Sequence, residues 1–215
     1  MTTEADTLAS RAYRQLEEMI VTLELSPGAV VSVADLTDRI DIGRTPLREA
    51  LQRLADERLV EILPRRGVRI TQIHLRDHLT LLETRRVLDR LMVRRAARRV
   101  ESLDRGALDA CGTAMREAAA ADQLDEFMRL DRQFDEIVVE AAQNPFAAEA
   151  AMPLHTHCRR FWYRFEARGD LRQSARLHEH LIQAIAQADE ERTADASDAL
   201  IDYLEEFTRS ALDRA

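Results

Sequence analysis

The stretch RTPLREALQRLADERLVEILPRRGVRI, residues 44–70, decides the fold of the first part of the chain. It opens as a helix, because Pro46 stands in a first turn, where no amide donor is needed, and apolar residues then recur at helical spacing. Two short strand-like runs follow, 59–63 and 68–70, with a turn over 64–67 between them. The order of helix, strand, turn and strand predicts a winged helix-turn-helix, a module that binds duplex DNA.

Two further helices are expected before this stretch. Apolar residues recur at helical spacing over 8–23. Ser32 is a suitable N-cap for a short helix that runs to Arg39, and residues 41–43 form the turn into the next helix. Together with the wing, these helices define a DNA-binding domain over residues 1–73.

Arg44, Thr45 and Arg48 lie on the face of the second helix opposite its apolar stripe. In a helix-turn-helix, the first residues of this helix meet base edges in the major groove, where arginine binds guanine O6 and N7 through two hydrogen bonds. These residues are therefore predicted to bind DNA. The alternative is an ordinary solvated face, on which Glu49 and Arg53 pair as i,i+4 neighbours.

Arg65, Arg66 and Gly67 form the tip of the predicted hairpin. Glycine adopts positive φ without steric cost, which suits a tight turn. Two arginines at such a tip suit contact with phosphates or insertion into a minor groove. These three residues complete the predicted DNA-binding set.

Charge is distributed unevenly along the chain. The net charge of the 215 residues is −8, which argues against a uniformly basic surface for nucleic acid. Residues 39–69, however, carry eight arginines against five acidic residues, a local charge of +3. Every basic residue besides histidine is arginine, so the number of arginines alone is weak evidence for phosphate binding.

The composition favours a soluble, cytoplasmic protein with no membrane partner. Cys111 and Cys158 cannot form a disulfide framework, the first residues are polar rather than a signal peptide, and no apolar run approaches the roughly 20 residues that span a bilayer.

Residues 74–215 read as an all-helical bundle, so the predicted fold is mostly α, with a small β-wing in the first domain. About six helices are expected. Their predicted ranges are 75–100, 104–120, 123–142, 145–168, 171–189 and 194–213.

Asp131 and Asp135 lie on the apolar stripe of the 123–142 helix, in line with Phe127 and Val138. Burying two carboxylates without partners is costly. They need a cation, a network of donors or a shared proton.

Three other helices repeat this signal. His178 lies on the stripe of Ile182, and Arg85 lies among leucines. Tyr203 shares the face that Ala196, Ala199 and Phe207 predict to be inward. The predicted effector-binding pocket therefore consists of Arg85, Asp131, Asp135, His178 and Tyr203. The alternative is that these residues belong to the core. His178 would then be hydrogen-bonded within the core, Tyr203 would be a core residue, and Arg85 would form an internal salt bridge with Asp89.

The segment 154–163 is rich in histidine and arginine. His155 and His157 are two residues apart, so they do not face together on a helix. His157 aligns with apolar neighbours and is the candidate for an additional imidazole. Arg159 and Arg160 either clamp a ligand carboxylate or, as we prefer, carry surface charge.

Residues 8–73 resemble the DNA-binding domain of GntR-type transcription regulators. The resemblance rests on Leu36-Thr37, on Asp41-Ile42-Gly43-Arg44-Thr45-Pro46-Leu47-Arg48-Glu49-Ala50-Leu51 and on Arg66-Gly67-Val68. It implies that Arg44, Thr45, Arg48 and Gly67 contact DNA. The chain departs from the family at Gly43, where a hydroxyl residue is usual, and at Ala34, where some FadR-like members have arginine.

Residues 75–213 resemble the FCD effector domain of the FadR-like branch. The matching motifs are Arg85-Arg86-Val87-Leu88-Asp89, Leu130-Asp131-Arg132-Gln133-Phe134-Asp135, Ala141-Ala142-Gln143-Asn144-Pro145 and His178. The resemblance implies a divalent metal, held by one aspartate and three histidines, that helps to bind a carboxylate effector.

The chain departs from this ligand set. Asp135 replaces the first histidine, and the last falls near Tyr203, so only Asp131 and His178 match. The candidate metal ligands are therefore Asp131, Asp135 and His178, with His157 as an addition. More carboxylate favours Mn²⁺ or Mg²⁺ over Zn²⁺ or Ni²⁺, with no metal as the other alternative.

These observations predict a homodimeric transcription regulator, a repressor like most relatives, that binds double-stranded operator DNA under the control of a small organic acid. A metal-dependent enzyme within a helical bundle is the alternative. The sequence disfavours it, because inward Glu-x-x-His pairs, a nucleophile elbow and a phosphate loop are absent. A scaffold that only dimerises is the third interpretation.

Overall fold

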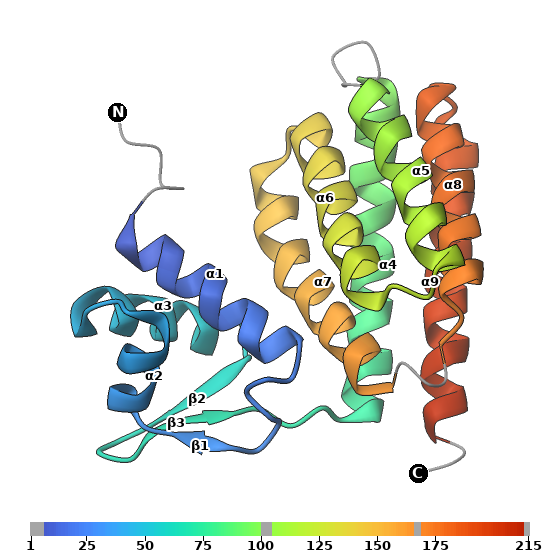
Figure 1. Ribbon diagram of the computed structural model, residues 1–215. Coiled ribbons are helices and arrows are strands. Elements are labelled where there is room, and N and C mark those ends of the chain that lie inside the picture. Colours follow the sequence, from blue (N-terminus) through green and yellow to red (C-terminus); the bar gives the residue numbers. More distant parts are fainter. Residues whose placement is uncertain (1–6, 100–104, 166–168, 213–215) are drawn as a thin grey trace. The chain divides into compact units, whose positions relative to one another are not determined.

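The computed structural model describes residues 7–99, 105–165 and 169–212. The chain divides into two compact units, Met1–His74 and Leu75–Ala215 (Figure 1). The predicted helix ends at residues 100, 104, 168 and 213 lie outside the described residues.

The helices of the first unit are α1 (Leu8–Val21), α2 (Val33–Ile40) and α3 (Arg44–Asp56). The N-cap predicted for α2 is confirmed, because Ser32 accepts a hydrogen bond from the Asp35 amide at 3.0 Å. α1 ends two residues earlier than predicted, and Leu23 beyond it adopts a φ of 64°.

A three-stranded antiparallel sheet forms the wing. Its strands are β1 (Val30–Val31), β2 (Val60–Leu63) and β3 (Gly67–Ile70), in the order β1-β3-β2. The hairpin of β2 and β3 confirms the prediction. β1 was not predicted, because two residues are too few to show the alternation of apolar and polar side chains that marks a strand. Only the pairing with β3 makes these residues a strand.

The core of the first unit lies between its helices and one face of the sheet. α1 packs against both α2 and α3, and α3 packs against β2. The most deeply buried side chains come from all three helices and from the hairpin: Leu16, Ile20, Leu36, Leu47, Leu54, Leu59, Val68 and Ile70.

The second unit is a helical bundle, as predicted. Its helices are α4 (Leu75–Arg98), α5 (Arg105–Ala120), α6 (Leu124–Ala142), α7 (Pro145–Phe165), α8 (Leu171–Ala186) and α9 (Glu190–Leu212). They run side by side (Figure 1). α4 packs against α6, α7, α8 and α9, while α5 packs against α6 and α8.

The predicted inward face of the last helix was wrong in part. Ala199 is exposed and Ala196 is half-buried, whereas Phe207 is buried as predicted. The buried face also includes Ala194, Ser197 and Ile201. The apolar residues of α9 fit two helical phases, and an alanine methyl is too small to distinguish them, so the packing against α4 and α8 selects the inward face.

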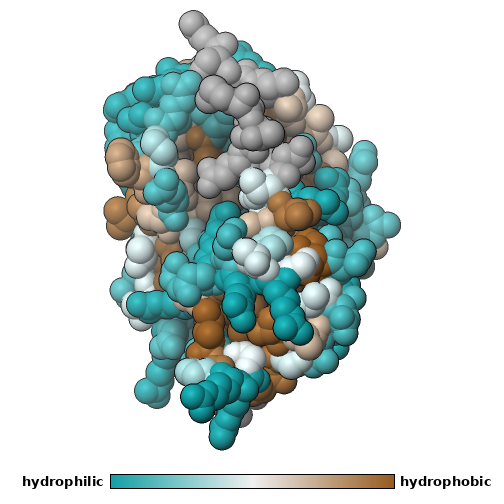
Figure 2. All heavy atoms as spheres, turned by 90° about the vertical axis from the view of Figure 1, so that its left-hand side faces the viewer, coloured by the Kyte–Doolittle hydropathy of each residue, from teal (hydrophilic) through white to brown (hydrophobic). Residues whose placement is uncertain are grey.

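Hydrophilic side chains dominate the face drawn in Figure 2, with small hydrophobic groups between them. Within the described ranges, no helix combines the length and apolar character needed to cross a bilayer.

Candidate functional sites: a DNA-binding surface and a buried polar cluster

The start of α3 presents an exposed cationic surface. Arg44, Thr45 and Arg48 are all exposed, whereas Leu47 between them is fully buried. Within the part of the chain that the structure describes, Arg44 and Arg48 make no ion pair. Their guanidinium groups are therefore available to a polyanion without first breaking an internal contact.

Arg53, nearer the end of α3, contacts other side chains of the protein. Its Nε lies 3.2 Å from Glu57 Oε1, and its guanidinium stacks 3.8 Å from the centre of the Tyr13 ring. The Tyr13 hydroxyl donates to Glu57 at 2.6 Å. The alternative interpretation, in which Arg53 pairs with Glu49, is not what the structure has: Arg53 contacts Glu57 and the Tyr13 ring of the neighbouring helix α1.

The wing tip has the backbone geometry that the glycine predicts. Gly67 adopts a φ of 101°, and a β-carbon there would lie 2.2 Å from the Val31 carbonyl oxygen. Arg65 also adopts a positive φ, of 63°, and the Arg66 amide donates to the Leu63 carbonyl at 3.0 Å to close the turn. Arg65 and Arg66 are exposed at the tip.

The bundle interior contains a cluster of paired charges. Arg159, from α7, lies between the two aspartates of α6: its Nη1 is 2.8 Å from Asp135 Oδ2 and 3.3 Å from Asp131 Oδ2. All three side chains are largely buried, Asp131 being the most exposed at 16%. The cation that the two carboxylates required thus comes from another helix.

His155, also from α7, extends the cluster toward α4. Its Nδ1 lies 2.9 Å from Asp135 Oδ2, and its Nε2 lies 2.7 Å from Asp89 Oδ1. Asp89 in turn accepts a hydrogen bond at 2.8 Å from Arg85 Nε. The alternative interpretation of Arg85 and Asp89 as an internal salt bridge is confirmed.

His178 ends the cluster on α8. Its Nδ1 donates to the Ser174 carbonyl at 2.8 Å, which orients the ring so that Nε2 lies 3.2 Å from Asp131 Oδ1. Phe134 packs edge-on against the ring, with centroids 5.4 Å apart. His180 is exposed.

The buried charges shift one another's pKa values. Burial alone would lower the pKa of His155, but the carboxylates of Asp135 and Asp89 outweigh it and raise that pKa to about 9. Burial alone would raise the pKa of Asp135, but the charges of His155 and Arg159 lower it to about 2. At neutral pH the cluster therefore holds a protonated imidazole between two carboxylates.

Tyr203, which was predicted to line the pocket, makes its hydrogen bonds at the start of α8. The Tyr203 hydroxyl accepts a hydrogen bond from the Asp170 amide at 2.8 Å and donates one to the Asp170 carbonyl at 3.0 Å. These two bonds connect α9 to the N-cap residue of α8. His157 is only half-buried, and the α7 imidazole that joins the carboxylates is His155.

Sequence reasoning missed His155 and misplaced the arginines beside it. Arg159 and Arg160 are buried, with exposed fractions of 5% and 1%, so the preferred interpretation of surface charge was wrong. A usable signal existed: His155 and Arg159 are four residues apart, as Asp131 and Asp135 are, so each pair shares one helix face.

The observed donor set does not fit a divalent metal as it stands. Arg159 occupies the space between Asp131 and Asp135, where a metal would need to lie about 2.0–2.2 Å from each oxygen. Among the described residues, no three His, Cys, Asp or Glu side chains are grouped to hold a metal ion.

Comparison with known families accounts for both units. Residues 8–70 match the model of "Bacterial regulatory proteins, gntR family", and residues 80–203 match that of the FCD domain. The chain belongs to the GntR family and carries an FCD domain. It is a DNA-binding transcriptional regulator.

Relatives and solved structures agree with this assignment. The chain is 26% identical over 200 residues to the HTH-type transcriptional repressor RspR of Escherichia coli, covering 92% of this chain and 86% of RspR. It is 25% identical to the Nta operon transcriptional regulator of Aminobacter aminovorans, covering 82% of each. E. coli McbR/YncC has the same fold, with a TM-score of 0.84 at 17% identity over 96% of this chain and 99% of that one.

Proposed function

We propose that this GntR-family protein is a cytoplasmic repressor whose binding to operator DNA is controlled by a small carboxylate. The observation that carries the DNA-binding part is the exposed start of α3, where Arg44 and Arg48 have no internal acidic partner within the described residues, beside a wing tipped with two further exposed arginines. The name of RspR supports repression as the mode of action.

A gel-shift assay on DNA from the region upstream of its own gene tests this part. We expect a retarded band that survives competition by unrelated DNA. Because phosphate contacts dominate affinity, binding should weaken as salt rises. The absence of a retarded band at low salt would refute the proposal.

The effector part of the proposal rests on the buried cluster. Its cations are all paired with aspartates, so an incoming carboxylate must replace one of these partners. Asp131 is the most exposed of the three aspartates, with the longer of the two contacts to Arg159. We place the effector carboxylate at Arg159, in exchange for Asp131, a change that would alter the contacts between α6, α7 and α8.

A thermal-shift panel of hydroxy acids, sugar acids, dicarboxylates and amino acids tests the effector part. One class is expected to raise the melting temperature and to change operator binding. Asp131→Ala should leave operator affinity unchanged and blunt the response to that class. Asp109→Ala, which removes an exposed carboxylate on α5, is the matched control and should respond like the wild type.

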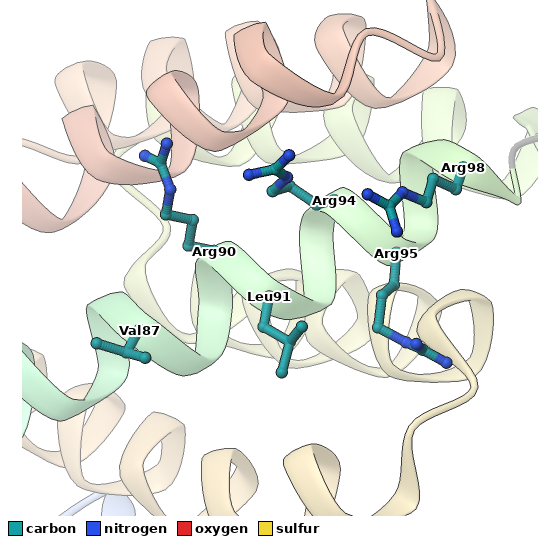
Figure 3. Close-up of a pocket in the computed structure, with 6 residues that line it drawn as sticks. All are labelled: Val87, Arg90, Leu91, Arg94, Arg95 and Arg98. Atoms are coloured by element: carbon teal, nitrogen blue, oxygen red, sulfur yellow. The ribbon is translucent and has the colours of Figure 1, made fainter.

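Dimerisation is the remaining part of the proposal, and α4 offers the surface for it. A shallow groove of about 410 Å³ runs along this helix, lined by Val87, Arg90, Leu91, Arg94, Arg95 and Arg98. In Figure 3, Arg90, Arg94 and Arg98 point toward α9, whereas Leu91 and Arg95 point away from it. Val87 and Leu91 are 69% and 44% exposed, and because they are four residues apart they form one small apolar patch on the helix.

The occupant that fits this surface is a second copy of the same helix in antiparallel orientation. If Val87 lies opposite Leu91 of a second copy, the same two-fold axis places the exposed Glu83 opposite Arg95. Apolar groups then meet at the centre and opposite charges meet at both ends. Such a dimer would present two recognition helices to a pseudo-palindromic operator.

A further inference from the structure

We propose that Arg159 is a built-in cation that takes the place of a metal ion, and that it covers a latent divalent-metal site formed by Asp131, Asp135 and His178. The proposal concerns what holds the bundle interior together. It does not depend on the identity of the effector or on operator binding.

The position of the guanidinium is the first observation. A single nitrogen, Arg159 Nη1, contacts Oδ2 of both Asp135 and Asp131, at 2.8 and 3.3 Å. Two carboxylates that converge on one point from the same face of α6 form the arrangement that a hard cation needs. Here that point is occupied by a nitrogen of the protein itself.

The orientation of His178 is the second observation. Its Nδ1 donates to the backbone carbonyl of Ser174, which leaves Nε2 on the side of Asp131, 3.2 Å from Oδ1. Metal-bound histidines are commonly held in this way, with one ring nitrogen donating to a carbonyl and the other directed at the metal. The imidazole is therefore already oriented toward the position that the arginine nitrogen fills.

The charge balance is the third observation. The cluster contains three carboxylates, from Asp89, Asp131 and Asp135, and two guanidinium groups, from Arg85 and Arg159. His155 lies between two of these carboxylates, with its ring nitrogens 2.9 Å from Asp135 Oδ2 and 2.7 Å from Asp89 Oδ1. Each carboxylate thus already faces a basic side chain, and a divalent ion between Asp131 and Asp135 would place a charge of +2 beside the Arg159 guanidinium.

Removing the Arg159 side chain should allow a divalent ion to bind at this position. In Arg159→Ala the two carboxylates lose their shared cation and repel each other, while a cavity opens at the position that Nη1 filled. A divalent ion would restore the charge balance, with two carboxylate oxygens and one imidazole nitrogen as its first ligands. Small movements of the side chains would shorten the distances to those of metal coordination.

The experiment compares the melting temperature of full-length variants after chelator treatment, with and without one equivalent of Mn²⁺ or Zn²⁺. We expect no metal-dependent shift for the wild type and a rise of several degrees for Arg159→Ala. The rise should be absent from the double variant Arg159→Ala/Asp131→Asn, which lacks one ligand. Arg176→Ala removes an exposed arginine of α8 outside the cluster and should behave like the wild type.

Metal analysis of the purified wild type provides a measurement that does not depend on the folding of any variant. We expect less than a tenth of an equivalent of transition metal per chain. A full equivalent, or a wild-type melting temperature that chelator lowers, would overturn the proposal. A folded Arg159→Ala whose melting temperature neither metal changes would also overturn the proposal. An Arg159→Ala that folds only with added metal would support it.

Discussion

At the residue scale, the two sites use arginine in opposite ways. Arg44 and Arg48 are exposed and make no ion pair within the described residues, whereas Arg159 is buried between two aspartates. The exposed groups retain their hydration and their full charge until a polyanion arrives. The buried group has given up its hydration, so removing one partner would leave an uncompensated charge in the interior.

Arg44→Ala and Arg48→Ala are each expected to weaken specific operator binding by about 1–3 kcal/mol, because each change removes one two-bond contact with a base. Fluorescence anisotropy with the operator found by gel shift measures the loss. Arg11→Ala removes the same charge from an exposed position of α1 and is the control. Unchanged affinity in both α3 variants would refute their assignment as base-reading residues.

His155 predicts how stability depends on pH. Its folded-state pKa is about 9, above the ordinary value of 6.5, so the protonated imidazole stabilises the fold fully below pH 6.5. That contribution is lost as pH rises from 6.5 through 9. The melting temperature of the wild type should therefore fall across this range.

His155→Gln cannot carry the charge, so its melting temperature should be lower at pH 6.5 and should fall less between pH 6.5 and 8.5. His180→Gln, at an exposed position of α8, is the control and should keep the wild-type slope. Equal slopes for the wild type and His155→Gln would show that the buried imidazole does not govern this dependence.

At the scale of single elements, the wing depends on one backbone conformation. Gly67 takes a φ of 101° at the start of β3, and its α-carbon lies so close to β1 that no side chain fits. The turn also holds Arg65 at a positive φ, which is unusual for a residue with a side chain. The same turn conformation thus determines both the geometry of the hairpin and the exposure of the two arginines at its tip.

Gly67→Ala is expected to destabilise the protein by about 1–3 kcal/mol, because alanine is strained at this φ and its β-carbon would meet the Val31 carbonyl. Urea unfolding measures the loss. Gly43→Ala is the matched control: no atom lies within 4 Å of its added β-carbon, so its cost should stay under about 1 kcal/mol. Equal losses in the two variants would argue against a strained wing.

At the scale of the whole molecule, the proposed function requires that effector binding in the helical unit changes the DNA-binding unit. The proposed dimer gives a route, because two recognition helices bind one operator only when their spacing matches it. An effector that favours one arrangement of the two copies shifts the population that is competent to bind DNA. The exposed face of α4 is central to this scheme.

Leu91→Glu should convert the proposed dimer to a monomer, because it places two carboxylates against apolar groups and against each other at the centre of the proposed interface. Sedimentation velocity measures the mass in solution. Leu8→Glu changes a leucine of α1 that is similarly exposed, at 54% against 44%, and should leave the dimer intact. A dimer that persists in Leu91→Glu would place the interface elsewhere.

Much of this architecture follows from local sequence. Helical spacing of apolar residues predicts the bundle, the turn before Gly67 predicts the hairpin, and the position of Pro46 predicts the start of α3. Local patterns also indicated that Asp131 and Asp135 lie on an inward face. These features depend on residues within about ten positions of each other, so the chain carries them without reference to its fold.

Only the tertiary structure decided which groups meet. Arg159 contacts Asp131 from 28 positions along the chain, and the Tyr203 hydroxyl binds the Asp170 carbonyl from 33 positions away. The two-residue strand β1 exists only because β3 pairs with it. The energy of a buried charge depends on its nearest neighbours in space, and helix periodicity fixes which side of a helix a group occupies but not what lies across from it.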